Sequence, residues 1–478
     1  MNLTAAFAAL LVKWRDVLPS DKGFLRVVHV LVGMLCAAGR HTVTGSIRFR
    51  GRQQQPWSAD YAAFSRASWD PAELFGAAFA EGVRQTRQID PDGPIVVALD
   101  DTSAKKSGKA IAAARWMKDP LSPKFTVNLM FGLRFLHSAL ILPLHRQGFA
   151  PRAISIGFDL APAPKKPGRK GTEADWTQYR YRQKSESLTM RAASVLARHR
   201  TRMDELGLTD RTLLSVGDGG YTNRTLLGNL PERTQFIGRV RKDIAICRRA
   251  RPGGRKVYGE RLPTPEQMRS DPEIPYLTAT FFYGGAEHEI RYKDIPDVLW
   301  QGGTKRRTMR VLILAPTRYR APFRSGRKYN YNDPAYLITT DLDSRATVLV
   351  QAVLDRWQIE PLHRDLKSGL GLGQAQTWSP KSVARIHTAV VATWSLLTLA
   401  ALNAYGLART QEFGPLPAWR RVRANHRASQ GDILERLRTE LDSAHKRHSS
   451  VSPPTFPTPT GIVPPTVPPI EQAQSPPG

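Results

Sequence analysis

Cysteines are scarce in this sequence. The 478 residues include two of them, Cys36 and Cys247, which lie far apart without a Cys-x-x-Cys motif or a nearby histidine pair. This spacing excludes a disulfide framework and a cysteine-ligated zinc site, so we expect both to be small, buried apolar residues. We also find no internal repeats.

Acidic residues are scarce relative to basic ones. The chain has 41 Asp and Glu against 70 Lys and Arg, which gives a formal net charge of +29 at pH 7. Such a charge attracts polyanions, so nucleic acid is the expected partner and an acidic membrane surface the weaker option. The alternative explanation is a GC-rich genome, in which arginine is common.

Long hydrophobic runs are few. Residues 1–16 contain a short apolar run without a preceding basic segment or a clear cleavage signal, which favours an amphipathic helix over a signal peptide. Residues 388–408 are long and apolar enough for a membrane span, but they include Thr, Ser and Asn. We therefore expect a helix buried in a soluble core, no membrane partner, and a cytoplasmic protein that associates with the bacterial nucleoid when bound to DNA.

The sequence pattern divides the chain into five regions. Residues 1–90 are mostly helical and include a basic, turn-rich segment, so we expect a DNA-binding region there. Residues 91–244 and 341–447 are expected to form the two parts of a catalytic core. Residues 245–340, rich in short strand-like runs, are interpreted as a β-rich insertion. The Pro-rich residues 448–478 are expected to be a disordered tail.

The first part of the core alternates between strand and helix signals. Its expected order is strand, strand, strand, helix, strand, helix, strand. The first three strands are predicted within residues 94–103, 124–135 and 139–149, followed by a basic loop at 161–171 and a helix within 185–207.

Three acidic residues stand out by their context. Asp100 ends the apolar run "VVALD", Asp218 ends "LLSVGD", and Glu360 lies in the helical segment "DRWQIEPLHRDLKSGLG". Burial of an unpaired carboxylate is costly, so such acids are usually paired, hydrogen-bonded or bound to a metal ion. Each acid taken alone is equally well explained by a strand end at the surface or a salt-bridged helix.

The combination of acids is more specific than its parts. Three carboxylates are enough to hold two divalent ions about 3.5–4 Å apart, because Mg²⁺ prefers oxygen ligands and retains waters and phosphate oxygens. Such a pair of ions stabilises both the attacking and the leaving oxygen in a phosphodiester displacement. The basic charge and the three acids are therefore consistent with a DNA-cleaving enzyme.

The order of these elements resembles that of the insertion-sequence DDE transposases, which have an RNase H-like catalytic domain. Within that family, the sequence is similar to the group with a Y-x2-R-x3-E-x6-K signature. Arg356, Glu360 and Lys367 match this spacing, whereas Val353 replaces the tyrosine. The triplet beginning at Asp100 matches the family's D-x-T motif, and "DGGYTN" matches the surroundings of its second acid. The resemblance covers roughly residues 94–405.

This resemblance implies an α/β fold: an RNase H-like mixed sheet flanked by helices, a β-rich insertion before the last catalytic helix, and an N-terminal helical region. It implies that Asp100, Asp218 and Glu360 are catalytic and hold two Mg²⁺ (or Mn²⁺) ions. The expected function is cleavage at the ends of a mobile element and strand transfer into target DNA by at least two protomers on paired ends. The alternatives are a transposase-derived DNA-binding protein without catalysis and a stand-alone RNase H-like nuclease.

Basic residues near the acids are candidate DNA contacts. One face of the predicted helix carries Arg356, Glu360, His363 and Lys367. We expect Arg356 and Lys367 to contact phosphates, whereas His363 either contacts DNA or fills space. The strand after the second acid adds three further candidates, which are otherwise ordinary solvated charges: Arg239, Arg241 and Lys242.

Two residues have alternative interpretations. Adjacent residues of a strand face opposite sides, so Asp100 and Asp101 cannot both be ligands. The D-x-T match favours Asp100, and Asp101 is then expected to cap a turn or pair with Lys105 or Lys106. Trp300 either packs in a hydrophobic core or stacks on an unpaired base.

Overall fold

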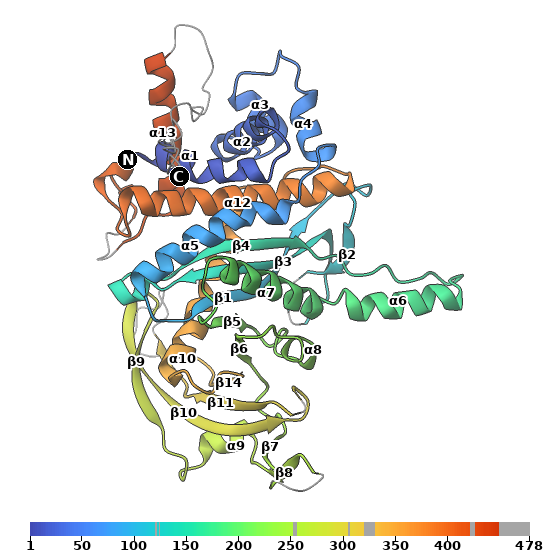
Figure 1. Cartoon of the computed structure of the whole chain (residues 1–478), viewed down its shortest axis with the longest axis vertical. Helices are drawn as coiled ribbons and strands as arrows, with labels where there is room; N and C mark the ends of the chain where they lie inside the picture. Colours follow the sequence, from blue (N-terminus) through green and yellow to red (C-terminus); the bar gives the residue numbers. More distant parts are fainter. Residues whose placement is uncertain are drawn as a thin grey trace, which may run out of the picture.

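The computed structural model describes residues 1–448 except 120, 121, 124, 252–255, 305, 320–329 and 421–425. In this part of the chain, twelve strands form one mixed sheet, and helices cover both of its faces (Figure 1). This is the mixed α/β, RNase H-like architecture that the sequence predicts. The Pro-rich tail, apart from residue 448, lies outside the described residues.

The centre of the sheet contains three antiparallel strands followed by two parallel ones. β3 pairs antiparallel with both β1 and β4, and β5 lies parallel between β1 and β6. The bounds are β1 (Ile95–Lys105), β2 (Arg115–Lys118), β3 (Leu129–Leu142), β4 (Arg152–Leu160), β5 (Leu213–Gly217) and β6 (Thr234–Arg239). The helices that follow β4 and β5 are α6 (Glu173–Ser185), α7 (Leu188–Glu205) and α8 (Arg224–Leu227).

The β-rich segment continues the same sheet. β14 pairs antiparallel with β6, and β11 and β10 extend the sheet beyond it. The bounds are β7 (Ile246–Arg249), β8 (Tyr258–Arg261), α9 (Pro265–Ser270), β9 (Leu277–Tyr283), β10 (Ala286–Trp300), β11 (Thr308–Leu314), β12 (Arg318–Tyr319), β13 (Asn330–Tyr331) and β14 (Ala335–Thr339). Trp300 is partly buried with its ring against the turn at Gly302 and Gly303, which favours the packing role over base stacking.

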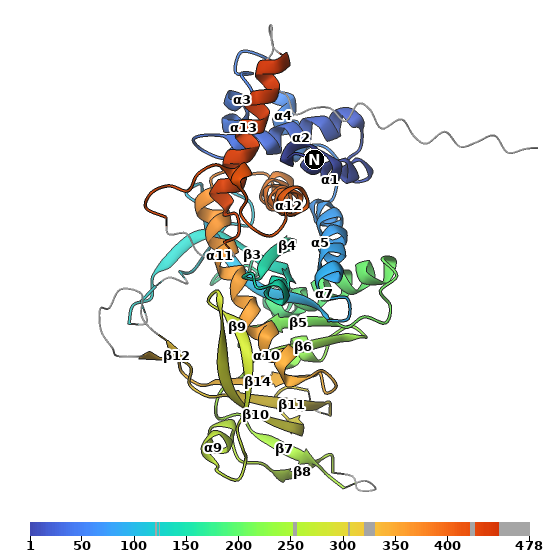
Figure 2. The ribbon, with the colours of Figure 1, turned by 90° about the vertical axis from the view of Figure 1, so that its left-hand side faces the viewer.

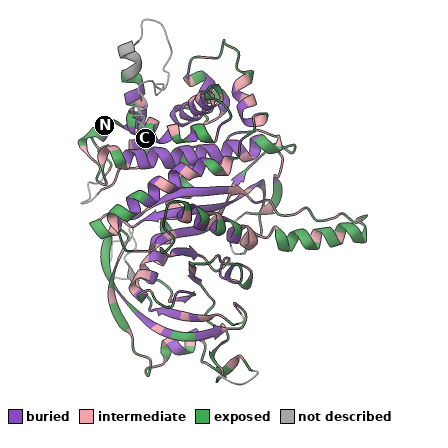
Figure 3. Ribbon diagram, viewed as in Figure 1, coloured by how far each residue is buried: buried purple, intermediate pink, exposed green. Residues whose placement is uncertain are grey.

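Of the N-terminal helices, α1–α4 pack above the long helix α12, whereas α5 lies on its other side, against β3 and β4 (Figures 1 and 2). The N-terminal helices are α1 (Leu3–Leu11), α2 (Asp21–Cys36), α3 (Val43–Phe49), α4 (Ser58–Ser65) and α5 (Phe75–Ile89); the long helix is α12 (Pro380–Tyr405), and α13 (Gln430–His448) follows it. The most apolar 18-residue window of α12 is 89% buried inside the protein. Figure 3 shows α12 buried along most of its length, as expected of a core helix.

The prediction of the first strands was wrong in two respects. Residues 129–142 form one strand rather than the ends of two, and the next strand is β4, which we did not predict. The two predicted strands left out residues 136–138, of which His137 and Ser138 are buried and hydrogen-bonded, to Ser155 and His199 respectively. Satisfied polar groups of this kind allow a strand to continue through the core.

Two further differences concern helices and the first acid. α6 was not predicted, because it has no buried residue and so lacks an apolar stripe. Asp100 does not end its strand, since β1 continues to Lys105. The segment with Glu360 is also not a uniform helix: α10 (Ala346–Asp355) passes through a 3₁₀ turn into α11 (Ile359–Arg364) and then a π-helical turn at Asp365–Gly369.

Candidate active site

The pairing of β1 with β5 brings the two aspartates together. These strands are parallel, and Ala98 lies opposite Val216. Because both chains continue in the same direction, two more residues along each place Asp100 beside Asp218. Asp218 follows the last residue of β5, and its Oδ1 accepts a hydrogen bond from the backbone N–H of Gly220 at 2.8 Å. The turn therefore holds this carboxylate next to β1.

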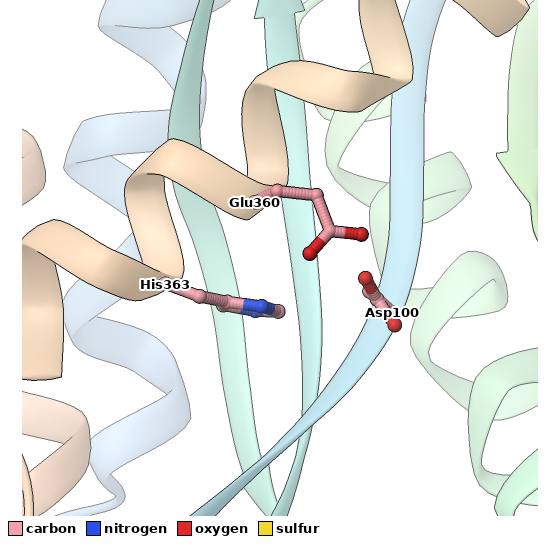
Figure 4. A group of neighbouring side chains, drawn as sticks. All are labelled: Asp100, Glu360 and His363. Carbon is pink, nitrogen blue, oxygen red and sulfur yellow. The ribbon is translucent and has the colours of Figure 1, made fainter. Parts of the chain in front are cut away.

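Glu360 joins this pair from α11. Figure 4 shows the carboxylates of Glu360 and Asp100 pointing toward one another, with the ring of His363 beside them. One oxygen of each acid and one nitrogen of His363 all lie within 4.8 Å of one another. The side chain of Asp100 is 17% exposed and that of Glu360 is 42% exposed. Residues distant in the sequence thus form a partly open cluster of negatively charged oxygens.

The cluster is electrostatically unfavourable without a cation. Burial raises the pKa of Asp100 to about 6, and the nearby carboxylates of Glu360 and Asp218 contribute to the increase. The backbone N–H of Asp101 and the guanidinium of Arg356 act in the opposite direction. Carboxylates held together in this way fit a divalent cation, which takes oxygen ligands and would relieve their repulsion.

Arg356 and Lys367 lie beside the acids. Arg356 is 3.5 Å from Oδ2 of Asp100 and 3.9 Å from Oε1 of Glu360, and its side chain is 16% exposed. Lys367 is exposed; desolvation lowers its pKa, whereas the charges of Asp100 and Glu360 favour its protonated form. In the free protein Arg356 therefore partly neutralises the acids, and Lys367 is open to solvent on the same side.

The structure places His363 in the interior, beside the acids. Its side chain is buried rather than directed toward solvent, and its Nε2 lies 2.9 Å from Nδ1 of His137 on β3. Burial lowers the pKa of His363 to about 3, with additional effects from Lys367 and Arg356. The imidazole is therefore neutral. Of the two alternatives for His363, DNA contact or space filling, its burial favours the second.

Asp101 also has a different partner from the expected one. Its carboxylate accepts a hydrogen bond from Nε of Arg134 on β3 at 2.8 Å. Lys106 instead is buried and donates to the backbone carbonyls of Gly373 and Ala375. The expected pairing of Asp101 with Lys105 or Lys106 was therefore wrong. Of the two neighbouring aspartates, Asp100 faces Glu360.

The three basic residues after the second acid lie at the end of β6. Gly217 is paired with Gly238, so the next residue, Arg239, lies beside Asp218. Arg239, Arg241 and Lys242 are all exposed, and Arg241 forms an ion pair with Asp243 at 2.7 Å. Arg239 is thus close to the acids, whereas Arg241 has an acidic partner of its own.

Two buried residues near the acids were missed in the sequence. Tyr221 is 1% exposed, and its hydroxyl has no hydrogen-bond partner among the described residues. Burial raises its pKa, and the charges of Asp101, Asp100 and Asp218 add to the shift, so the phenol lies near all three. His137 is the second; the only signal for it was a histidine within an apolar strand.

A basic pocket lies in the N-terminal region. It has a volume of about 1130 Å³ and lies between α2–α4 and residues 374–379. Three exposed arginines line it, Arg40, Arg48 and Arg66, and none forms an ion pair within the described part of the chain. We call this the N-terminal basic pocket. No acidic residue is among its lining, so it suits a polyanion.

Comparison with known proteins identifies one family. A family model described as "DDE superfamily endonuclease" matches residues 7–307, which is more than half of the chain. The matched range contains Asp100 and Asp218 and ends before Glu360. No curated protein matches the sequence.

Proposed function

The chain belongs to the DDE superfamily endonuclease family, and from this premise we propose that it is an insertion-sequence transposase that cuts the ends of its element and joins them to target DNA. The observation that carries the proposal is that Asp100 of β1 lies close to Glu360 of α11 and, by the register of β1 and β5, beside Asp218. Metal-dependent phosphodiester cleavage uses a cluster of this kind, because its carboxylates hold the metal ions at the phosphate that is cut.

We propose that the three carboxylates hold two Mg²⁺ (or Mn²⁺) ions, with Asp100 as the ligand that neighbours both other acids. When bound, such ions activate the attacking oxygen and stabilise the leaving oxygen. The chain's own contribution is to hold the acids rigidly on two strands and a helix. Arg356 and Lys367, beside the acids, are placed to contact the phosphates once the cations occupy the carboxylates.

The N-terminal basic pocket is proposed to hold the element's end. Lys106, the residue after β1, donates hydrogen bonds to the backbone carbonyls of Gly373 and Ala375, and Ala375 lines the pocket. We propose residues 1–90, which supply the three arginines of this pocket, as the DNA-binding region.

Cleavage and binding assays test this function. With labelled DNA of the element's ends, Asp218→Asn is expected to abolish cleavage while retaining binding, because the substitution removes a metal ligand but no DNA contact. Unchanged cleavage would contradict the metal assignment. Asp210→Asn is a suitable control, because Asp210 is exposed and precedes the start of β5, whereas Asp218 follows its end.

A strand-transfer assay distinguishes the remaining alternatives. When element ends and a plasmid are supplied together, a transposase yields joined products, whereas a stand-alone nuclease yields only cuts. A non-catalytic DNA-binding protein yields neither, although it still shifts the labelled ends. We further propose that two or more protomers act on paired ends, which the size of the complex on DNA would reveal.

A further inference from the structure

The acids have an imidazole as a close neighbour. A nitrogen of His363 lies within 4.8 Å of oxygens of both Asp100 and Glu360 (Figure 4). The side chain is 8% exposed, so it cannot turn into solvent without breaking its packing. A buried neutral imidazole at this distance from two carboxylates has the composition of a mixed nitrogen and oxygen ligand set.

The ring of His363 is held by a chain of hydrogen bonds. Its Nε2 lies 2.9 Å from Nδ1 of His137, and Nε2 of His137 lies 2.8 Å from the Ser155 hydroxyl. Both His137 and Ser155 are fully buried. Nδ1 of His363 has no hydrogen-bond partner within the described part of the chain. If Nδ1 binds a metal ion, Nε2 carries the proton and donates to His137, which in turn donates to Ser155.

The hydrogen bonds from His363 through His137 to Ser155 resemble those that hold metal-binding histidines in place. Such histidines usually donate their second N–H to a buried acceptor, which sets the tautomer and the ring orientation. The chain spans two neighbouring strands, β3 and β4, and α11, so the ring is oriented by the same sheet that carries Asp100.

We infer that His363 is a nitrogen ligand of the ion held by Asp100 and Glu360, with His137 as a positioning residue. The inference rests on the proposed metal site. It predicts a preference for Mn²⁺ over Mg²⁺, because Mg²⁺ strongly prefers oxygen ligands whereas imidazole suits transition metals.

Pulsed electron paramagnetic resonance of Mn²⁺ bound to the whole chain tests this inference without an activity measurement. The wild-type spectrum should contain the coupling of a directly bound ¹⁴N nucleus. Protein containing [¹⁵N]histidine should replace it with a ¹⁵N coupling, a result that needs no substitution and so does not depend on a variant's folding. A wild-type spectrum without nitrogen coupling would overturn the inference.

Two variants locate the ligand and its support. His363→Gln should lose the nitrogen coupling, and persistence of the coupling would overturn the assignment. His137→Gln should keep the coupling but lower Mn²⁺ affinity about 10–100-fold, the usual effect of removing such a support, and reduce the Mn²⁺-to-Mg²⁺ selectivity. An unchanged selectivity would contradict the positioning role.

His199→Gln is the matched control. His199 is also fully buried and bonds to a serine of β3, with its Nε2 2.8 Å from Ser138 Oγ. Because Ser138 faces the side of the sheet opposite to His137, this variant should leave Mn²⁺ affinity and selectivity unchanged. An equal loss of selectivity in this variant would show that burial alone, rather than position, causes the effect.

The result also separates this inference from the proposed function. Tight Mn²⁺ binding that depends on Asp100 and Asp218 but shows no nitrogen coupling refutes only the role of His363. Failure of the wild-type chain to bind Mn²⁺ or Mg²⁺ refutes both.

Discussion

The loop that contains Gly373 and Ala375, after α11, is anchored by Lys106 and His387. The contribution of this buried pair to the free energy of unfolding depends on pH. His387 of α12 is 2% exposed; its Nδ1–H donates to the Val383 carbonyl at 2.7 Å, and its Nε2 accepts from Nζ of Lys106 at 3.0 Å. Lys106 also binds the carbonyls of Gly373 and Ala375. Protonation of Nε2 would break this anchor and place two cations in contact.

The sign and size of the effect follow from the pKa values. Burial, with a contribution from the charge of Lys106, lowers the pKa of His387 from 6.5 to about 3. The unfolded chain therefore takes up this proton first as the pH falls. The stability linked to His387 is complete above pH 6.5 and is lost progressively from pH 6.5 to about 3. At 1.36 kcal/mol per pH unit, the loss between pH 7 and pH 5 is about 2 kcal/mol.

Urea unfolding of wild type and His387→Gln at pH 7 and pH 5 measures this quantity. The variant should lose about 2 kcal/mol less than wild type between the two pH values, whatever its stability at pH 7. Lys106, whose pKa burial lowers to about 8, stays charged over this range and adds no difference. His288→Gln, at an exposed position, should behave as wild type. Equal losses in wild type and His387→Gln would refute the reasoning.

Three further predictions concern the acids and the DNA-binding surface. Asp100→Asn should abolish cleavage, whereas Asp101→Asn should retain it within about tenfold, since Asp101 pairs with β3; equal losses in a cleavage assay would contradict this difference. Arg48→Gln and Arg66→Gln should each weaken DNA binding and reduce the slope of log affinity against log salt by about 1, as measured by titration at several salt concentrations, and an unchanged slope would exclude the pocket. Arg356→Gln should destabilise the metal-free protein by about 1–3 kcal/mol in urea unfolding, because Asp100 and Glu360 lose their cation. Saturating Mg²⁺ should reduce this difference between variant and wild type. A difference that does not change with Mg²⁺ would contradict competition of Arg356 and the metal for the same carboxylates.

The sequence predicted the mixed α/β fold and drew attention to the acids that the structure brings together. Asp100 and Asp218 were recognisable because each follows an apolar run of sequence, and Glu360 because of its spacing from Arg356 and Lys367. The sequence could not show the register that places Asp100 beside Asp218, because strand pairing depends on contacts between distant segments.

Local sequence could not show which polar residues find buried partners. The two alternatives for His363 stayed open because its partner His137 lies on a distant strand. In the same way, His137 and Ser138 lie inside β3 because partners on β4 and α7 satisfy them. α6 shows the converse: it is stabilised by a capping box between Thr172 and Asp175 and has no buried face for a periodic pattern to reveal.

The most direct test of the account is a crystal of the chain with an uncleaved DNA end and Mn²⁺, measured at a wavelength that reveals manganese by anomalous scattering. The account predicts anomalous peaks at the carboxylates of Asp100, Asp218 and Glu360, next to the phosphate to be cut. Manganese bound elsewhere, with these three carboxylates free of metal, would contradict it.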